Sequence, residues 1–255
     1  MTVAAAIHRK LPGEDILYLG DTARVPYGVK TKETVTRYAQ ECSLFLINQK
    51  VKLIVVACNT VSAVALPYLR DVLKTPILGV LEPGVQAAIS SLTTDSIGIM
   101  GTPSTIESGA YQDRIKELRA DVKVISQACP LLVPLAEEGI YDGEIAELVL
   151  QTYLSKFDDT SISSLIMGCT HYPLFKNTIN RMLGGGILLV DSAETVATEV
   201  EAMLLRESLI KTYGTGKVKC FITDLPRNFS EKAKLFFGSD LIHVSKQNIL
   251  EIKVN

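Results

Sequence analysis

The sequence has no tryptophan, only three histidines and only five cysteines among its 255 residues. The cysteines stand singly and no Cys-x-x-Cys pair occurs, which argues against a zinc ribbon. Their odd number and wide spacing are typical of reduced thiols rather than of a disulfide framework. The cysteines are Cys42, Cys58, Cys129, Cys169 and Cys220.

Long hydrophobic runs and an excess of one charge are also lacking. The longest apolar runs, such as Leu53–Cys58, are far too short to span a bilayer, and residues 1–10 have no secretory signal core. The 26 basic and 28 acidic residues leave a net charge of −2, which argues against nucleic-acid binding. We therefore expect a globular cytoplasmic protein with no membrane or nucleic-acid partner, forming one large domain or two small ones.

Short apolar runs alternate with helix-like stretches along the chain, which predicts an α/β fold with parallel sheets. The expected strands are Ile16–Leu19, Leu53–Ala57, Ile77–Leu81, Ser96–Met100, Val122–Ile125, Ser164–Met167, Ile187–Val190, Lys217–Ile222 and Leu241–Val244. The expected helices are Thr2–Lys10, Thr31–Gln49 and Val61–Leu73, followed by stretches at about 105–119, 143–157, 173–183, 193–212 and 228–237.

Two breaks in this pattern indicate a division into two domains. Glu82-Pro83-Gly84 follows the third expected strand and could be the first crossing between domains. Gly184-Gly185-Gly186 could lie near the second crossing, or could be a surface turn after a helix. We expect a first domain of residues 1–82 plus 192–255 and a second of residues 83–191, with the site in the cleft between them.

Two cysteines occupy similar positions in the pattern. Leu53–Thr60 and Leu165–Thr170 each contain an apolar strand, then a cysteine, then a polar residue before a helix. Ligands of open α/β sheets bind beyond the carboxyl ends of strands, and a helix N-terminus can lower the pKa of a thiol. Cys58 and Cys169 are therefore candidates for a base or nucleophile, although a single cysteine after a strand often only packs in the core. The other three are expected to pack: Cys42, Cys129 and Cys220.

Further candidates for chemistry lie close to these cysteines or in expected loops. His171 suits proton transfer near neutral pH, but could equally begin a helix or bind backbone. Glu137-Glu138, in an expected loop, could be a solvated face, could orient His171 or could bind an ammonium group. The polar residues beside the cysteines, which could bind a carboxylate or only cap helices, are Asn59, Thr60 and Thr170.

Several short motifs run in order over nearly the whole chain. They are Gly20–Gly28 (GDTARVPYG), Ala57–Thr60 (ACNT), Gly101-Thr102 with Ser108–Tyr111, Cys129-Pro130 with Val133–Gly139, and Gly168–Leu174 (GCTHYPL). Together they resemble the glutamate racemases of the aspartate/glutamate racemase family. The two cysteine motifs point to the wider group, and the segment from Asp21 to Gly28 points to its glutamate branch.

The resemblance implies a cofactor-independent enzyme, without a metal, that interconverts L- and D-glutamate for peptidoglycan synthesis. It implies two pseudo-symmetric α/β domains facing each other across a cleft, and it is compatible with a homodimer. Cys58 would act on the D-isomer and Cys169 on the L-isomer, from opposite faces of the substrate. His171 would assist Cys169, and Glu137 matches an auxiliary carboxylate. The positions that match substrate-binding residues are Tyr27, Gly28, Asn59, Thr60, Thr170 and His171.

The beginning of the sequence departs from the family pattern. Family members normally begin with a strand and an Asp-Ser-Gly-x-Gly-Gly loop ahead of a segment like Thr2-Val3, and this sequence has neither. We therefore expect a start upstream of Met1, and for the chain as given a first domain without a central strand and weak racemisation at best. The alternatives are a paralogue that binds an acidic amino acid with little or no turnover, and an aspartate racemase of the same group.

Overall fold

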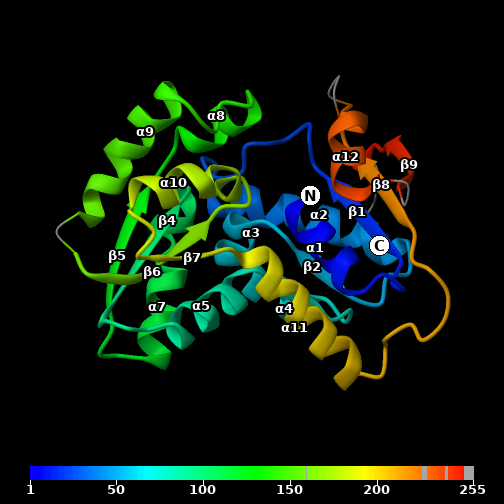
Figure 1. The fold of residues 1–255 in the computed structure, drawn as a ribbon. Coiled ribbons are helices and arrows are strands. Elements are labelled where there is room, and N and C mark those ends of the chain that lie inside the picture. Colours follow the sequence, from blue (N-terminus) through cyan, green and yellow to red (C-terminus); the bar gives the residue numbers. More distant parts are fainter. Residues whose placement is uncertain (159, 226–228, 239–240, 250–255) are drawn as a thin grey trace.

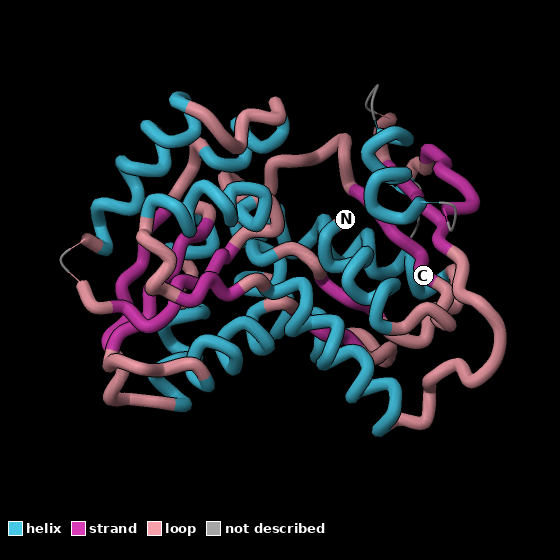
Figure 2. Tube along the Cα trace, viewed as in Figure 1, coloured by secondary structure: helices cyan, strands magenta, loops and turns pink. Residues whose placement is uncertain are grey.

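A computed structural model describes residues 1–158, 160–225, 229–238 and 241–249 of the chain. Its strands and helices alternate (Figures 1 and 2). Every strand pairing in this part is parallel, which confirms the predicted fold class. Each expected strand is present: β1 (Ile16–Gly20), β2 (Ile54–Val56), β3 (Ile77–Gly79), β4 (Ser96–Gly101), β5 (Lys123–Ala128), β6 (Ile162–Gly168), β7 (Leu188–Val190), β8 (Val218–Ile222) and β9 (Leu241–Lys246).

The helices are shorter and more interrupted than expected. They are α1 (Thr2–Lys10), α2 (Lys32–Asn48), α3 (Asn59–Val64), α4 (Leu66–Val72), α5 (Leu81–Ser90), α6 (Pro103–Glu107), α7 (Ala110–Leu118), α8 (Leu132–Glu137), α9 (Glu144–Leu154), α10 (Lys176–Met182), α11 (Ser192–Arg206) and α12 (Phe229–Phe237). The predicted helix 61–73 is divided near Pro67, which has no N–H to donate. The predicted helix 105–119 is divided at Gly109, whose φ of 70° glycine adopts at little cost. Among the described helices, none combines the length and apolar content of a membrane span.

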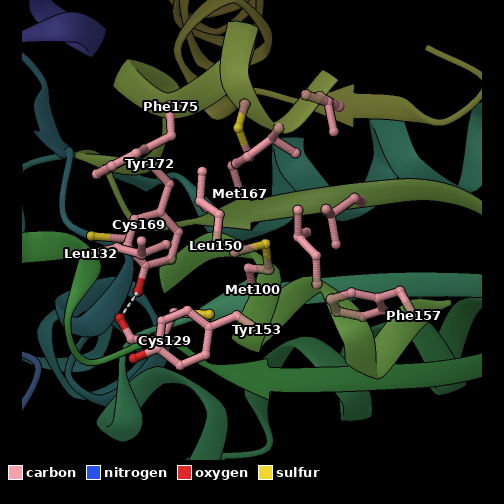
Figure 3. Packing of buried hydrophobic residues seen from close by; sticks show 14 of the residues in the cluster. Met100, Cys129, Leu132, Leu150, Tyr153, Phe157, Met167, Cys169, Tyr172 and Phe175 are labelled. Atoms are coloured by element: carbon pink, nitrogen blue, oxygen red, sulfur yellow. Dashed lines mark hydrogen bonds between the residues drawn. The ribbon is translucent and has the colours of Figure 1, made fainter. Parts of the chain in front are cut away.

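The sheet with strand order β5-β4-β6-β7 forms the centre of one domain. All residues of β4 and β6 are buried, because helices cover both faces of the sheet. Met100, Leu150 and Phe175 belong to the core on one face (Figure 3), while Ile99 and Tyr111 belong to the core on the other. Burial on both faces explains why most residues of these strands are apolar, without the alternation of a half-exposed strand.

The other domain contains two separate parallel sheets, β1-β8-β9 and β2-β3. β1 is hydrogen-bonded to β8 and β2 to β3, but in the described part of the chain no strand joins β1 to β2. This agrees with the expectation that the first domain lacks a central strand. Both strands line a cavity of about 1230 Å³ that continues into the cleft between the domains.

The chain crosses between the domains at two helices that pack against each other, α5 and α11 (Figure 1). Glu82-Pro83-Gly84, which we expected could be the first crossing, is part of the first turn of α5. Proline is tolerated there because the first N–H groups of a helix have no intrahelical partner. Gly184-Gly185-Gly186 is a turn after α10, which is the alternative that the sequence left open, and it precedes β7, which still pairs with β6. The boundaries 82/83 and 191/192 stay a prediction.

Candidate active site

The large cavity brings together every residue that the sequence marked as catalytic or substrate-binding. Cys58 lies just beyond the carboxyl end of β2, and Cys169 lies directly after β6, so the two thiols come from different sheets. The predicted residues that line this one cavity are Tyr27, Gly28, Cys58, Asn59, Thr60, Glu137, Cys169, Thr170 and His171.

The electrostatic environment of the two thiols differs from the expectation. The helix N-termini suggested lowered pKa values, but burial raises the pKa of both thiols, that of Cys169 to about 12. Backbone N–H groups do contact each sulfur and oppose the shift, those of Thr60 and Val61 at Cys58 and those of residues 170–172 at Cys169. Desolvation outweighs these hydrogen bonds, so both thiols rest in the neutral form near pH 7. A thiol in this state would have to lose its proton before it could act as a base.

A short chain of polar contacts leads away from Cys169. The Sγ atom of Cys169 lies 3.8 Å from Nδ1 of His171. Since a carboxylate only accepts, Nε2–H of His171 donates to Oε1 of Glu137 at 2.6 Å, and Nδ1 is the ring nitrogen that faces the thiol. We expected Glu137 to lie in a loop, but it is the last residue of α8. The next residue, Glu138, is exposed. Among the two acidic residues, only Glu137 contacts His171.

Hydroxyl groups from both domains meet beside Cys58. The side chain of Thr60 is buried, and its Oγ1 lies 3.0 Å from that of Thr102 and 3.3 Å from that of Thr105. Thr102 and Thr105 were not predicted as part of the site. Their position at and after the carboxyl end of β4, the neighbour of β6, is the signal that could have found them.

The loop after β1 reaches the same place through Gly28. The carbonyl oxygen of Gly28 accepts hydrogen bonds from the backbone N–H and the Oγ of Ser104, at 3.1 and 2.9 Å. A Cβ atom on Gly28 would lie 2.5 Å from the Cβ of Thr102, so only glycine fits this contact. The site thus includes a close approach of backbone from one domain to a side chain of the other.

Tyr27 belongs to a polar cluster formed by its own loop and α2. Its hydroxyl donates to Oδ2 of Asp21, which also accepts from Nε of Arg24 at 2.7 Å. Arg24 in turn donates to Glu41, and its guanidinium lies 4.1 Å from the ring centroid of Tyr38. Since the hydroxyl of Tyr27 already donates to Asp21, mainly the ring and the backbone of Tyr27 remain to contact a ligand in the cavity.

The remaining cysteines pack within the fold, as expected, but Cys42 and Cys129 also line the cavity, whereas Cys220 does not. Cys129 and Cys220 are fully buried, and the carbonyl oxygen of Cys129 accepts a hydrogen bond from the Tyr172 hydroxyl at 2.9 Å (Figure 3). Cys42 is half-buried in α2 with Nη2 of Arg24 at 3.6 Å from its sulfur. Within the described ranges, no group of three or more His, Cys, Asp and Glu side chains could hold a metal ion.

Comparison with known proteins identifies the family of this chain. The family model for Asp/Glu/Hydantoin racemase matches residues 1–200. The chain belongs to this racemase family. It is 45% identical to the glutamate racemase of Geobacter metallireducens over 242 residues, which are 94% of this chain and 90% of the relative. It is 44% identical to the glutamate racemase of Aquifex aeolicus, over 94% of this chain and 91% of the relative.

Solved structures of racemases have the same two-domain fold. The glutamate racemase of Francisella tularensis, solved in complex with D-glutamate, matches with a TM-score of 0.91 and 34% identity, over 97% of this chain and 93% of that one. A glutamate racemase of Bacillus anthracis matches with a TM-score of 0.92 and 35% identity, over 97% and 92% of the two chains. The protein is therefore a two-domain α/β enzyme of the racemase class.

Proposed function

We propose that this racemase interconverts L- and D-glutamate with Cys58 and Cys169 as its two acid/base residues. The observation that carries the proposal is that two thiols from separate parallel sheets line one cavity, together with polar groups suited to bind a carboxylate. The curated relatives and the structure with D-glutamate support glutamate as the substrate.

The chemistry needs one thiolate and one thiol on opposite faces of the α-carbon. The thiolate takes the α-hydrogen as a proton, and the electron pair left behind is delocalised towards the α-carboxylate. The opposite thiol then gives its proton to the other face of the carbon, which inverts the stereocentre. The thiolate and the thiol have exchanged places, so the enzyme is ready for the other isomer.

Each cysteine has neighbours that can support its thiolate. When Cys169 acts as the base, Nδ1 of His171 can accept the thiol proton, and the resulting imidazolium is stabilised by Glu137. When Cys58 acts as the base, the hydroxyl of Thr60 and two backbone N–H groups stabilise its negative charge. We propose that Cys169 acts on the L-isomer and Cys58 on the D-isomer, as the resemblance implies.

The same resemblance supports a metabolic role for the product, D-glutamate. D-Glutamate made in the cytoplasm would serve peptidoglycan synthesis, without a metal or cofactor in the enzyme. A homodimer stays a prediction. For the substrate, we propose contacts to Gly28, Asn59, Thr60 and Thr170, with the ring of Tyr27 at the edge of the site.

A second candidate is binding of an acidic amino acid with little turnover. The division of the first-domain sheet favours it, because within the described residues β2, which leads to Cys58, is hydrogen-bonded as a strand only to the three residues of β3. A cysteine on such a weakly held segment would be less well positioned for proton transfer.

The test is to measure racemisation from each isomer by circular dichroism, with aspartate assayed beside glutamate. Cys58→Ala and Cys169→Ala are each expected to abolish racemisation. In D₂O, Cys58→Ala should still exchange the α-hydrogen of L-glutamate, and Cys169→Ala that of D-glutamate. The matched control is Cys220→Ala, which removes a buried thiol in β8 that does not line the cavity.

Three results would decide between the candidates. Full activity in either cavity mutant would refute the two-base mechanism. Calorimetric binding of glutamate without any change in optical rotation would favour the second candidate. Faster turnover of aspartate than of glutamate would identify an aspartate racemase.

A further inference from the structure

Tyr111 is a buried side chain that contacts the neighbours of both cavity cysteines. It lies in the first turn of α7 and is fully buried. Its hydroxyl donates to Oδ1 of Asn59 at 2.6 Å, and Asn59 is the residue that follows Cys58. Its ring lies against Gly168, the residue before Cys169, where a Cβ atom would be 3.6 Å from Cε2. Tyr111 itself does not line the cavity, so it acts from behind the site.

The hydrogen bond to Tyr111 determines in which direction each end of the Asn59 amide points. A phenol hydroxyl that donates to Oδ1 keeps this oxygen on the Tyr111 side, and the NH₂ group must point elsewhere. Asn59 is only 2% exposed, and its Nδ2 has no hydrogen-bond partner among the described residues. A buried donor without a partner is unfavourable, and an acceptor on a ligand in the cavity would satisfy it.

We propose that Tyr111 is a positioning residue, which holds the Asn59 amide so that its NH₂ group donates to a carboxylate oxygen of the substrate. The proposal rests on the proposed function, since it takes glutamate as the ligand. Without the hydroxyl, the amide could rotate and present its oxygen to the substrate carboxylate, which would be repulsive. Tyr111 would therefore act on substrate binding through Asn59, and its ring would keep its packing role.

The test variant is Tyr111→Phe, which removes the hydroxyl and keeps the ring against Gly168. We expect KM for both glutamate isomers to rise about tenfold, as expected when a buried hydrogen bond is lost, while kcat falls less than about threefold. Calorimetric Kd values for L- and D-glutamate should rise by the same factor as KM. The control is Tyr153→Phe, which also removes a buried hydroxyl in this domain, one that accepts from the N–H of Leu131 at 3.3 Å. It should leave Kd and KM unchanged.

A double-mutant comparison separates positioning from a merely structural role. Asn59→Ala alone should raise Kd, and adding Tyr111→Phe to it should raise Kd no further, because the two residues act through one contact. Additive effects would overturn the proposal, as would an unchanged Kd and KM in Tyr111→Phe. Thermal unfolding of each variant shows whether the fold is intact.

The outcomes also separate this proposal from the function on which it rests. If the parent protein racemises glutamate and Tyr111→Phe has the parent's Kd and KM, only the proposal for Tyr111 fails. If the parent binds glutamate without racemising it, the proposed function fails and the Kd comparison still decides the role of Tyr111. If the parent neither binds nor racemises glutamate, both are overturned.

Discussion

The contact between His171 and Glu137 leads to a quantitative prediction for Glu137→Gln. The substitution keeps an oxygen that can accept from Nε2–H of His171 but removes the negative charge that stabilises an imidazolium. Hydrogen bonds to charged groups are worth about 1.5–3 kcal/mol when shielded from water. Here the Glu137 side chain is 57% exposed and that of His171 is 32% exposed, so solvent screens the interaction.

After this discount we expect a loss of about 1 kcal/mol of transition-state stabilisation, which is about a fivefold fall in kcat/KM. His171→Ala removes the proton acceptor itself and should lower kcat/KM about a hundredfold or more. In the His171→Ala background, Glu137→Gln should have no further effect, because Glu137 acts through the ring. The assay is the initial rate of racemisation by circular dichroism.

The matched control is Glu138→Gln, which changes the neighbouring exposed carboxylate and should leave kcat/KM unchanged. A loss in Glu137→Gln as large as that in His171→Ala would refute the reasoning, since Glu137 would then have to transfer a proton itself. No loss at all would refute it as well. A further loss in the His171→Ala background would show that Glu137 has a role independent of the ring.

Two further predictions concern the close contact at Gly28 and the raised thiol pKa of Cys169. Gly28→Ala would bring a Cβ atom against the side chain of Thr102 and should lower kcat/KM for racemisation at least about tenfold. Far-UV circular dichroism should show little change in secondary structure. Parent-like activity would contradict the contact. With a pKa of about 12, roughly one Cys169 thiol in 10⁴ is a thiolate at pH 8. The rate at which iodoacetamide alkylates Cys169, followed by mass spectrometry, should therefore rise about tenfold per pH unit between pH 7 and 9. A rate that does not depend on pH would indicate a preformed thiolate.

Most of the fold could be predicted because strand order in the chain and apolar content are local properties. Runs such as 165–167 are apolar throughout because their strands are covered on both faces, and this pattern is present in the sequence itself. Helix α5 was missed because Pro83 and Gly84 normally mark a break, yet in the first turn of a helix neither disturbs a hydrogen bond. Helix α8, of six residues, is too short to show a periodic pattern.

The positions of the candidate site residues could also be predicted, since each cysteine follows an apolar strand and the carboxyl ends of parallel strands are where such folds bind ligands. The chemistry of those residues could not. The thiol pKa of Cys169 depends on burial by segments far away in the chain, and this burial reversed the lowering expected from a helix start alone.

The sequence by itself determined which elements form, in which order, and which two cysteines lie at strand ends, because these follow from patterns a few residues long. Only the tertiary structure decided what surrounds them. The contacts of Glu137 with His171, of Tyr111 with Asn59 and of Thr102 with Gly28 each join segments more than thirty residues apart. Such pairings arise from the packing of two sheets and their helices, which no local pattern encodes.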